Sequence, residues 1–440
     1  MIPMFLILYF GLMLLFGTPL IYTIVIAVLS IPIFFGTSTL ELTTMVEAFV
    51  QGSINTNTGL TILLFILAGE LMSRGQLTER IFNVFAYFLG KKKGFMPILS
   101  IATCMFYGAI SGSGPATTAA VGAMCYPMLV QMGYDRIFSA AILVTAGCLG
   151  MVIPPSVPLT GVNALSGGLD LTVLYAVSAV VGVVAGFLII LYAYFYCLRK
   201  GNGDQKKINA WVDSLRSRGF ASIIKESIWA LLTPVIILGS IFSGLADTAE
   251  AAALSLIYAV FVSLFIYKTS TFKDVIKTLK KSAINGAPML IMLSFAQVFS
   301  TGLAATNLAN VLTNGILGNN MSPTILMCTF CILMLIMGCV NGLNWIQLLP
   351  LLFPIMVQTG LEPFTCCVAL VLTQAIGLCT PPIGLCLFVM QPMAKCSIGE
   401  LGKAMLPYLA ILVILVFILV LCPGLFEVFT ANGYVPGING

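Results

Sequence analysis

Four short segments of this 440-residue chain combine hydroxyl residues, asparagine, glycine and proline inside otherwise apolar surroundings. They are SGSGPATTAA at 111–120, IPPS at 153–156, NGLN at 341–344 and TPP at 380–382. Glycine and proline interrupt helices, and an interruption leaves peptide N–H and C=O groups without helical partners. In hydrocarbon each unpaired group costs several kcal/mol, so such segments persist only where protein or a water-filled cavity covers them. The pattern therefore predicts buried ligand sites at four helix breaks.

The first break suits an anionic ligand. Ser113 or Gly114 can cap the helix that follows, and Pro115 fits its first turn. The free N–H groups there have partial positive charge, which favours a carboxylate. Side-chain hydroxyls add neutral donors and acceptors. The residues expected to bind substrate in this break are Ser111, Gly112, Ser113, Gly114 and Thr117.

The second break suits a cation, because each proline removes an N–H and the carbonyls before Pro154 and Pro155 lose their helical partners. Those carbonyls and the Ser156 hydroxyl are hard oxygen ligands of the kind that Na⁺ needs. The second half of the chain repeats this chemistry. Its expected substrate contacts are Asn341, Gly342 and Asn344. The full set of predicted Na⁺ ligands is Ser113, Pro154, Pro155, Ser156, Asn341, Thr380, Pro381 and Pro382.

A structural interpretation competes with this functional one. Glycine and proline are common in membrane helices, where they can simply permit kinks or close packing. An isolated break is explained by packing as readily as by binding, whereas four symmetrically placed breaks favour a site. Gly182 and Gly186 have the small-residue spacing of helix contacts, and there we keep the packing interpretation.

The composition places these breaks in a polytopic membrane protein. Hydrophobic residues make up 60% of the chain, charged residues 8%, and the mean hydropathy is +1.08. Soluble domains have about 25% charged residues, so a cytosolic enzyme, a nucleic-acid binder and a disordered chain are excluded. One apolar span needs about 20 residues, which leaves room for roughly ten to fourteen crossing or half-crossing segments. We expect an all-α fold in the lipid bilayer.

The lack of histidine excludes several kinds of site. With 0 His, HExxH zinc sites, Ser-His-Asp triads and haem ligation by histidine cannot form. The 13 cysteines include one CxxC pair, Cys328 and Cys331, but no quartet, so we interpret them as small apolar residues. No organic cofactor is expected.

Basic residues concentrate at 91–93, 199–225 and 268–281, which the positive-inside rule assigns to the cytoplasm. The mixed-charge stretch 199–226 is typical of a cytoplasmic linker and has the pattern of an amphipathic helix. Apolar runs at 286–316 and 405–422 are expected to form spans. The predicted parts are N-terminal scaffold spans (1–58), a first repeat (59–198) with hairpin one (about 95–132), the linker (199–226), scaffold spans with a basic loop (227–285), a second repeat (286–427) with hairpin two (about 323–358), and a tail (428–440).

The two halves share sequence at a constant offset of 227 residues. PMLVQMGYD at 127–135 resembles PIMVQTGLE at 354–362, and GMVIPPS at 150–156 resembles GLCTPPI at 377–383. The basic segments place Asp135 on the cytoplasmic side of the membrane. The number of predicted spans places its counterpart Glu362 on the outer side. The repeats are therefore predicted to be inverted, each with a re-entrant hairpin and a broken helix. Inverted repeats of this kind recur in secondary transporters, with the site near the bilayer midplane.

Three acidic residues fall within apolar segments, where an ionised carboxylate is costly and often functional. Glu70 lies four residues before Arg74 and is expected to pair with it in a structural role. Asp247 and Glu250 either belong to a site within the membrane or lie at a short outer turn near water.

These motifs resemble the large membrane subunit of tripartite ATP-independent periplasmic (TRAP) transporters over about 40–427. The stretches are LLFILAGELM (63–72), YGAISGSGPATTAAVGA (107–123), PMLVQMGYD (127–135), GMVIPPSVP (150–158), SGLADTAEAAA (243–253) and GLCTPPIG (377–384). The chain departs from the family at 247–250, where a Thr-Pro-Thr-Glu run is usual, and at Gly342, where an acid is frequent. The Gly-rich loop at 164–170 also differs.

The resemblance implies a bacterial inner-membrane permease that imports an organic acid anion, such as a four-carbon dicarboxylate or sialic acid, with Na⁺ as coupling ion. A periplasmic solute-binding protein would deliver the substrate, and a small membrane subunit would brace the large one. The implied fold is of the elevator type found in the ion-transporter superfamily, in which a unit holding both hairpins moves against a scaffold. Each hairpin tip and the break opposite it would hold one Na⁺, with the substrate between the tips. The resemblance implies no nucleic-acid partner.

Three other functions compete with import of this kind. A channel needs a continuous polar or charged lining, whereas here the polar residues cluster at breaks. An intramembrane serine enzyme would have to use Ser111 or Ser113, and the sequence offers neither a clear base. A stand-alone Na⁺/anion symporter with the same hairpins but no binding protein is the strongest alternative. Neighbouring genes for a small four-span protein and a secreted binding protein would separate the stand-alone symporter from the importer that uses a binding protein.

Overall fold

The computed structural model of the chain describes residues 20–430 except 37–40, 54–56, 75–76, 202, 307, 309, 313, 315–321 and 341–343, together with residues 4, 5, 8, 9 and 11. Every regular element within these residues is a helix, as the composition predicts. Up to the linker the helices are α2 (Leu20–Phe35), α3 (Leu42–Ser53), α4 (Asn57–Arg74), α5 (Leu77–Leu89), α6 (Phe95–Ser111), α7 (Gly114–Gln131), α8 (Arg136–Cys148), η2 (Leu149–Met151), α9 (Val157–Leu165) and α10 (Leu171–Lys200). The linker and second half contain α11 (Gln205–Ser217), α12 (Phe220–Phe242), α13 (Thr248–Phe261), η3 (Val262–Ile266), α14 (Phe272–Ala305), α16 (Pro323–Val340), α17 (Asn344–Gln358), α18 (Pro363–Gly377), α19 (Leu385–Ala394), α20 (Ile398–Leu421), η4 (Pro423–Phe426) and α21 (Glu427–Thr430).

The interruptions fall between these helices at the positions that the sequence predicts. Hairpin one consists of α6 and α7, and hairpin two of α16 and α17. The apolar segments that precede the two Pro-Pro pairs form α8 with η2 and α18. The linker contains the amphipathic helix α11, whose buried residues Ile208, Val212 and Leu215 form the face that packs on α5.

Two helices begin earlier than the apolar runs indicate, because capping residues extend them into charged segments. α14 begins at Phe272, so most of the basic segment 268–281 is helical. Thr271 and Asp274 cap its first turn reciprocally, each side chain accepting a hydrogen bond from the backbone N–H of the other. α20 begins at Ile398, where Ser397 and Glu400 form the same capping box.

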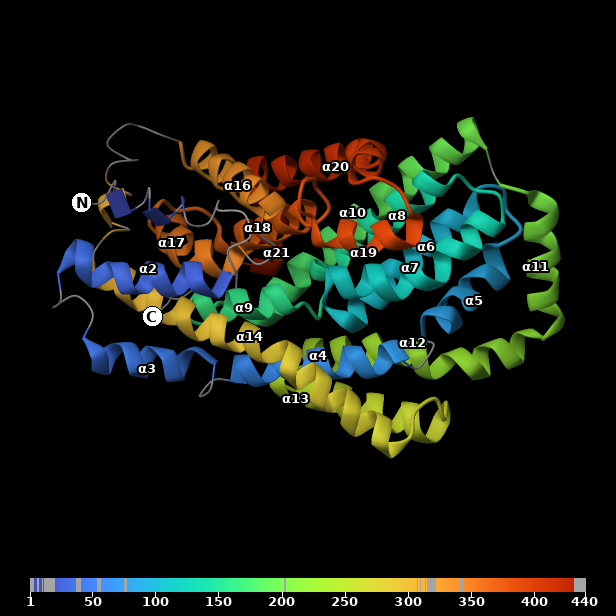
Figure 1. The fold of residues 1–440 in the computed structure, drawn as a ribbon, viewed down its shortest axis with the longest axis horizontal. Coiled ribbons are helices and arrows are strands. Elements are labelled where there is room, and N and C mark those ends of the chain that lie inside the picture. The colour runs from blue at the N-terminus through green and yellow to red at the C-terminus, as the bar shows by residue number, and fades with distance from the viewer. Residues whose placement is uncertain are drawn as a thin grey trace.

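The two hairpins lie toward opposite ends of the molecule (Figure 1). α6 and α7 lie toward the end that α11 covers, whereas α16 and α17 lie toward the end where α2 and α3 are found. Between the hairpins, α8 and α18 form the centre: every residue of α18 is buried, and α8 is buried from Phe138 to Cys148. A helix that is apolar around its whole circumference belongs inside a bundle, and these two broken helices are the core of the fold.

Local structure repeats at the offset seen in the sequence. Asp135 caps α8 and Glu362 caps α18, each with a carboxylate that accepts from backbone N–H groups of the first turn. Two residues before each cap, Gly133 and Gly360 have φ values of 84° and 75°. This left-handed conformation favours glycine, so both copies use the same residue for the same turn. The two halves therefore share local structure as well as sequence.

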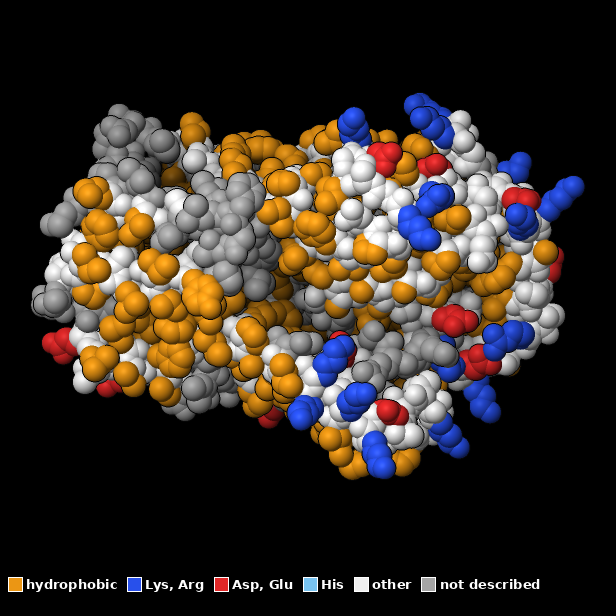
Figure 2. Space-filling model, in the orientation of Figure 1, with side chains coloured by type: hydrophobic (Ala, Val, Ile, Leu, Met, Phe, Trp, Pro, Cys, Tyr) orange, Lys and Arg blue, Asp and Glu red, His pale blue; other side chains and the backbone are white. Residues whose placement is uncertain are grey.

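The surface is apolar over the body of the molecule and basic at one end. Figure 2 shows hydrophobic side chains across the left and centre of the view, with Lys and Arg gathered at the right. Two of the basic segments meet there, since Lys91 forms an ion pair with Asp213 and Gln205 Nε2 donates to Lys91 O at 3.0 Å. Among the described residues, five helices are long and apolar enough to cross a membrane, or six if the bent pair 59–72 and 77–89 is one span. These features are those of a polytopic membrane protein.

Candidate functional site

Hairpin one reverses direction within two residues, Gly112 and Ser113. Gly112 ends α6 with φ of 61°, a conformation that favours glycine. Glycine is also needed for space, because a Cβ at this position would lie 2.7 Å from the carbonyl oxygen of Pro155. Ser113 is extended, and α7 starts at Gly114 with Pro115 in its first turn. The tip thus holds Ser113 between two helix ends, as predicted.

The hydroxyl groups of the tip have two different roles. Ser111 Oγ lies 2.7 Å from Thr117 Oγ1, which donates to Ser113 O at 2.8 Å. Ser111 and Thr117 are both buried, so this bonding fixes the shape of the tip. The Ser113 side chain is half-buried and makes no cap hydrogen bond with any described residue. Of these three hydroxyls, that of Ser113 is the one left for a ligand.

The first broken helix is held by serine hydroxyls. Ser156 is fully buried and caps α9: its Oγ accepts from Leu159 N at 3.4 Å and donates to Met151 O. Ser178 of α10 donates in the same way to Val152 O. The carbonyls of Met151 and Val152, just before the Pro-Pro pair, therefore have hydroxyl partners. Ser156 Oγ keeps one lone pair in this arrangement, since a hydroxyl oxygen accepts up to two hydrogen bonds.

Ser178 does not appear among the residues that the sequence suggests. It lies on a 30-residue apolar helix, where a serine is normal and needs no special explanation. Only the fold shows that its hydroxyl reaches Val152 O across 26 positions of sequence. No local signal marks such a partner.

Hairpin one packs directly against the first broken helix. Val157 N donates to Gly112 O at 3.4 Å, which joins the tip to the start of α9. Behind the tip, Gly108 faces Gly150, and a Cβ on Gly108 would lie 2.8 Å from Gly150 Cα. The structure therefore brings the tip residues Gly112 and Ser113 against 150–157, so the two predicted breaks of the first half are one region.

Hairpin two meets the second broken helix in the same way. Ile383 N donates to Cys339 O at 3.1 Å. Gly338 faces Gly377, and a Cβ on Gly377 would lie 2.6 Å from Gly338 Cα. Thr380 Oγ1 donates to a carbonyl of its own helix at 2.8 Å. The pair of facing glycines is thus present in both halves.

The Pro-Pro break of the second half is more exposed than the Pro-Pro break of the first half. Thr380 and Pro381 are half-buried and Pro382 is exposed, whereas Pro154 and Pro155 are buried. The tip of hairpin two carries three other predicted site residues. Asn341 and Gly342 lie outside the described residues, and Asn344 begins α17 with its side chain outside them.

The two halves interlock across the centre. Trp345, the second residue of α17, is 1% exposed, and its ring packs on Gly161 of α9. In the reciprocal position, Met390 of α19 packs on Gly122 of α7. The second arm of each hairpin thus contacts the short helix that follows the break of the other half. The two halves therefore contact each other through corresponding helices.

Helix α9 connects the two hairpin regions. Its cap Ser156 lies beside hairpin one. Five residues later, Gly161 packs against Trp345 in the first turn of α17. At 1.5 Å per residue these two contacts are about 7–8 Å apart along the helix. The second broken helix also contacts α8 itself, because Cys379 Sγ donates to Val144 O at 3.5 Å. The interruptions at 111–115, 153–156 and 380–382 therefore lie among contacts that join the two halves, together with the described ends of α16 and α17.

The convergence region is neutral and rich in oxygen. Its buried polar side chains are hydroxyls and amides, among them Ser111, Thr117, Ser156, Thr160 and Gln374. Within the described part of the chain, no group of three Asp, Glu, Cys or His residues is arranged to hold a metal ion. Carbonyl and hydroxyl oxygens suit a hard monovalent cation, and helix N-termini suit an anion, without a fixed charge.

The three acidic residues within apolar segments form contacts outside this region. Glu70 pairs with Lys281 of α14 at 3.2 Å, and the side chain of its expected partner Arg74 lies outside those described. Asp247 and Glu250 form the capping box of α13 and are exposed or half-exposed at its start, which supports the outer-turn reading. All three therefore have structural roles.

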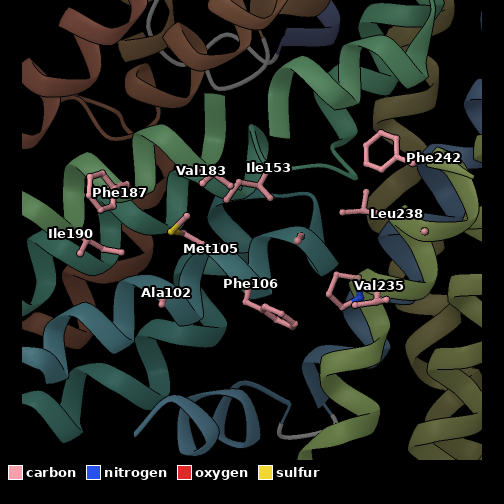
Figure 3. Close-up of a pocket in the computed structure, with 13 residues that line it drawn as sticks. Ala102, Met105, Phe106, Ile153, Val183, Phe187, Ile190, Val235, Leu238 and Phe242 are labelled. Atoms are coloured by element: carbon pink, nitrogen blue, oxygen red, sulfur yellow. The ribbon is translucent and has the colours of Figure 1, made fainter. Parts of the chain in front are cut away.

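A cavity of about 700 Å³ lies beside the first Pro-Pro break. Figure 3 shows it between side chains of α6, α10 and α12, with Ile153 of the break among those that line it. Its lining is apolar, for example Phe106, Phe187 and Leu238, so it offers nothing to bind a carboxylate. It is a hydrocarbon-lined gap between α12 and the hairpin-bearing core.

A helical membrane fold with paired broken helices that interlock at its centre is that of a membrane transporter. The family described as "Tripartite ATP-independent periplasmic transporter, DctM component" matches residues 7–425, and the chain belongs to it. The resemblance noted from the sequence motifs is thereby confirmed.

Curated relatives and solved structures agree with this assignment. The isethionate TRAP transporter permease protein DctMQ of Oleidesulfovibrio alaskensis is 32% identical over 95% of this chain, which spans 64% of that longer relative. The C4-dicarboxylate TRAP transporter large permease protein DctM of Pseudomonas aeruginosa is 30% identical over 83% of this chain and 84% of the relative. The crystal structure of the Alcanivorax borkumensis YdaH transporter is similar in fold, with a TM-score of 0.60 and 16% identity over 87% of this chain and 88% of that one.

Proposed function

We propose that the chain is the membrane permease of a secondary importer that takes up an organic acid anion together with Na⁺. The observation that supports this most strongly is that the described helix breaks of both halves lie in one neutral, oxygen-rich region. Backbone irregularity at membrane depth is tolerated where it lines a site, and here both halves contribute the same kind of break. The family membership adds the transporter class to this geometry.

The anion would bind between the hairpin tips. The start of α7 presents backbone N–H groups and the Ser113 hydroxyl, which together favour a carboxylate or sulfonate. The tip of hairpin two would supply Asn341, Gly342 and Asn344 from the other side. Relatives named for isethionate and for C4-dicarboxylates suggest small organic anions as the substrate class.

The cation would bind at the breaks. In the first half, Ser113, the carbonyls of Pro154 and Pro155, and Ser156 form a donor set of neutral oxygens, which fits Na⁺. The remaining acceptor site on the buried Ser156 Oγ supports this fit. In the second half, Asn341, Thr380, Pro381 and Pro382 would form the equivalent set.

The interlocked arrangement supports an elevator mechanism with inverted repeats. The hairpins, α8 and α18 pack on one another reciprocally, so they would move as one unit. The outer helices α12 and α13 would form a scaffold, separated from α6 and α10 by the apolar cavity of Figure 3. An apolar boundary contains no hydrogen bonds that must break during sliding.

The partners follow from the family. A periplasmic solute-binding protein would deliver the substrate at the inner membrane of a bacterium, and a small membrane subunit would bind the permease. The isethionate relative is longer than this chain and is named DctMQ, which suggests that a second component can share the polypeptide. A stand-alone symporter of the same architecture is the alternative.

Uptake into proteoliposomes tests this proposal. Isethionate, succinate and sialic acid would be offered under an inward Na⁺ gradient or an equal K⁺ gradient, with and without a solute-binding protein and a small subunit sought among the neighbouring genes. We expect accumulation only with Na⁺ and only with both partners. Uptake that needs no binding protein would favour the stand-alone symporter, and uptake indifferent to Na⁺ would reject the coupling.

A further inference from the structure

Two adjoining cavities lie at the basic end of the molecule, far along the chain from the helix breaks. They occupy about 620 and 350 Å³ where α8 begins, α10 ends and α20 begins. Both are lined by Asp135, Phe138, Tyr196 and Lys200, so they form one continuous pocket. Figure 2 shows Lys and Arg side chains gathered at this end of the molecule. None of the proposed transport residues lines this pocket.

The pocket is positively charged. Arg136, Lys200 and Lys403 reach it from three different helices, and all three side chains are exposed. The Arg136 guanidinium is held in place because its Nη2 donates to Ala394 O at 2.9 Å, which leaves further N–H donors for a ligand. Phosphate oxygens are the groups that such a cluster of Arg and Lys recognises best.

The carboxylates near the pocket already accept hydrogen bonds from backbone N–H groups. The Asp135 carboxylate accepts from Phe138 N at 2.7 Å as the cap of α8. Glu400, on α20, accepts from Ser397 N at 2.9 Å in the capping box of that helix. Three cations therefore face two carboxylates whose oxygens are partly used by helix ends, which leaves the pocket able to hold an anion.

Aromatic rings form the inner wall. Phe138 stacks on Tyr196 at 4.4 Å, and Tyr192 meets Tyr408 edge-on at 4.7 Å. Tyr192 lies eight residues before Lys200 on α10, about 12 Å deeper along the helix. The pocket thus changes from charged at its mouth to aromatic inside, which is the order of headgroup and acyl chain in a lipid.

Two buried tyrosines complete the pocket. Tyr134 is 5% exposed and Tyr408 1% exposed, and both line it. Neither hydroxyl has a hydrogen-bond partner within the described part of the chain. Both hydroxyl oxygens are buried behind the pocket wall, so the two tyrosines contribute their rings to the wall and not a polar contact to a ligand.

We propose that this pocket binds the phosphodiester headgroup of an anionic phospholipid from the adjacent leaflet. Arg136, Lys200 and Lys403 contact the phosphate, and the rings of Tyr192 and Tyr196 cover the start of an acyl chain. A soluble phosphate compound offers the same charge but leaves the aromatic wall bare, which is why a lipid fits better. The lipid then joins the ends of α8, α10 and α20, all from the core of the molecule.

Native mass spectrometry of the purified full chain, titrated with phosphatidylglycerol or phosphatidylethanolamine, tests this assignment. The double variant Lys200→Gln/Lys403→Gln leaves the anchored Arg136 untouched, so folding is retained. Its matched control is Lys206→Gln/Lys277→Gln, which removes two exposed lysines outside the pocket. Each lysine near a membrane surface contributes about 1 kcal/mol to binding of anionic lipid, so losing two weakens binding roughly 30-fold.

The expected result is one tightly retained phosphatidylglycerol on the wild type and the control, at least about tenfold weaker binding to the double variant, and weaker binding of phosphatidylethanolamine. Equal affinity of the double variant and the control for phosphatidylglycerol overturns the proposal. So does equal retention of the two lipids. If glycerol 3-phosphate displaces phosphatidylglycerol at a comparable concentration, the ligand is a soluble phosphate compound and not a lipid.

Discussion

Two serines of the first half differ in what their hydroxyls already do. Ser156 donates to Met151 O and accepts from Leu159 N, so it is part of the fold as well as a candidate Na⁺ ligand. Ser113 makes no cap hydrogen bond among the described residues, although it occupies the cap position. Substitution of Ser113 therefore separates ligand binding from folding, whereas substitution of Ser156 changes both.

Ser113→Ala is expected to reduce Na⁺-driven uptake at least tenfold while the folded protein remains. The hydroxyl makes no structural bond that would be lost, so the free energy of unfolding should stay within about 0.5 kcal/mol of the wild type. Uptake in proteoliposomes and thermal unfolding of the same preparation measure the two effects. Ser214→Ala, on the exposed face of α11, removes a surface hydroxyl and should change neither. Wild-type uptake by Ser113→Ala would exclude this hydroxyl from the site.

Individual site residues could be predicted from the sequence where the residue type is unusual in an apolar helix. Pro154, Pro155 and the Ser-Gly-Ser-Gly run mark their own breaks, because proline and glycine have few other uses in an apolar helix. Ser178 and Gly161 are ordinary residues in apolar helices, and their importance comes from partners distant in sequence. Only tertiary structure reveals such roles.

Facing glycines are the contact that the two halves share at the level of helices. Gly108 meets Gly150 where hairpin one crosses the end of α8, and Gly338 meets Gly377 where hairpin two crosses the end of α18. A small residue on both sides lets the backbones touch, and in membranes close packing of this kind replaces the hydrophobic effect as the attraction between helices. The tips are held over the breaks by these crossings.

Gly377→Ala is expected to lower the free energy of unfolding by about 1–3 kcal/mol, because the new Cβ would lie 2.6 Å from Gly338 Cα and the two helices must separate. Thermal unfolding in detergent measures this loss. Gly399→Ala is the matched control: it lies in α20 with no atom within 4 Å of the added Cβ, and should be neutral or slightly stabilising. Equal stability of the two variants would mean that the crossing is not tight.

The existence of the hairpins could be predicted, but their meeting could not. Hairpin positions follow from local signals in 95–132 and 323–358. The packing of Trp345 on Gly161 joins residues 184 positions apart and has no sequence signature. The early start of α14 had a local signal, the Thr271–Asp274 capping box, which the dense positive charge of the same segment obscured.

Charge is distributed asymmetrically over the whole molecule. Lys and Arg gather at one end, with α11, whereas α3 and its Glu47 lie at the other (Figures 1 and 2). The positive-inside rule predicts that the α11 end faces the cytoplasm. Because the hairpins approach from opposite ends, this orientation would place hairpin one on the cytoplasmic side and hairpin two on the periplasmic side.

Cysteine labelling tests the orientation. The background replaces with serine the four native cysteines that are exposed or partly exposed, Cys328, Cys339, Cys396 and Cys422. Ser217→Cys and Glu47→Cys then place an exposed probe at each end. A membrane-impermeant maleimide should label position 47 in intact spheroplasts and position 217 in inside-out vesicles. Labelling of both positions from the same side would contradict the inverted arrangement.

The central claim is that the breaks converge to form a Na⁺ site, and thermal unfolding in Na⁺ against an equal concentration of K⁺ tests it without knowledge of the substrate. At ten times its dissociation constant, a bound ion stabilises the folded state by about 1.4 kcal/mol. The wild type and Ser214→Ala should therefore melt at a higher temperature in Na⁺ than in K⁺. Ser113→Ala/Ser156→Ala should show a smaller difference, because only the site of the second half is left intact. Identical melting of the wild type in the two salts, or a Na⁺ effect as large in the double variant as in the wild type, would contradict the account.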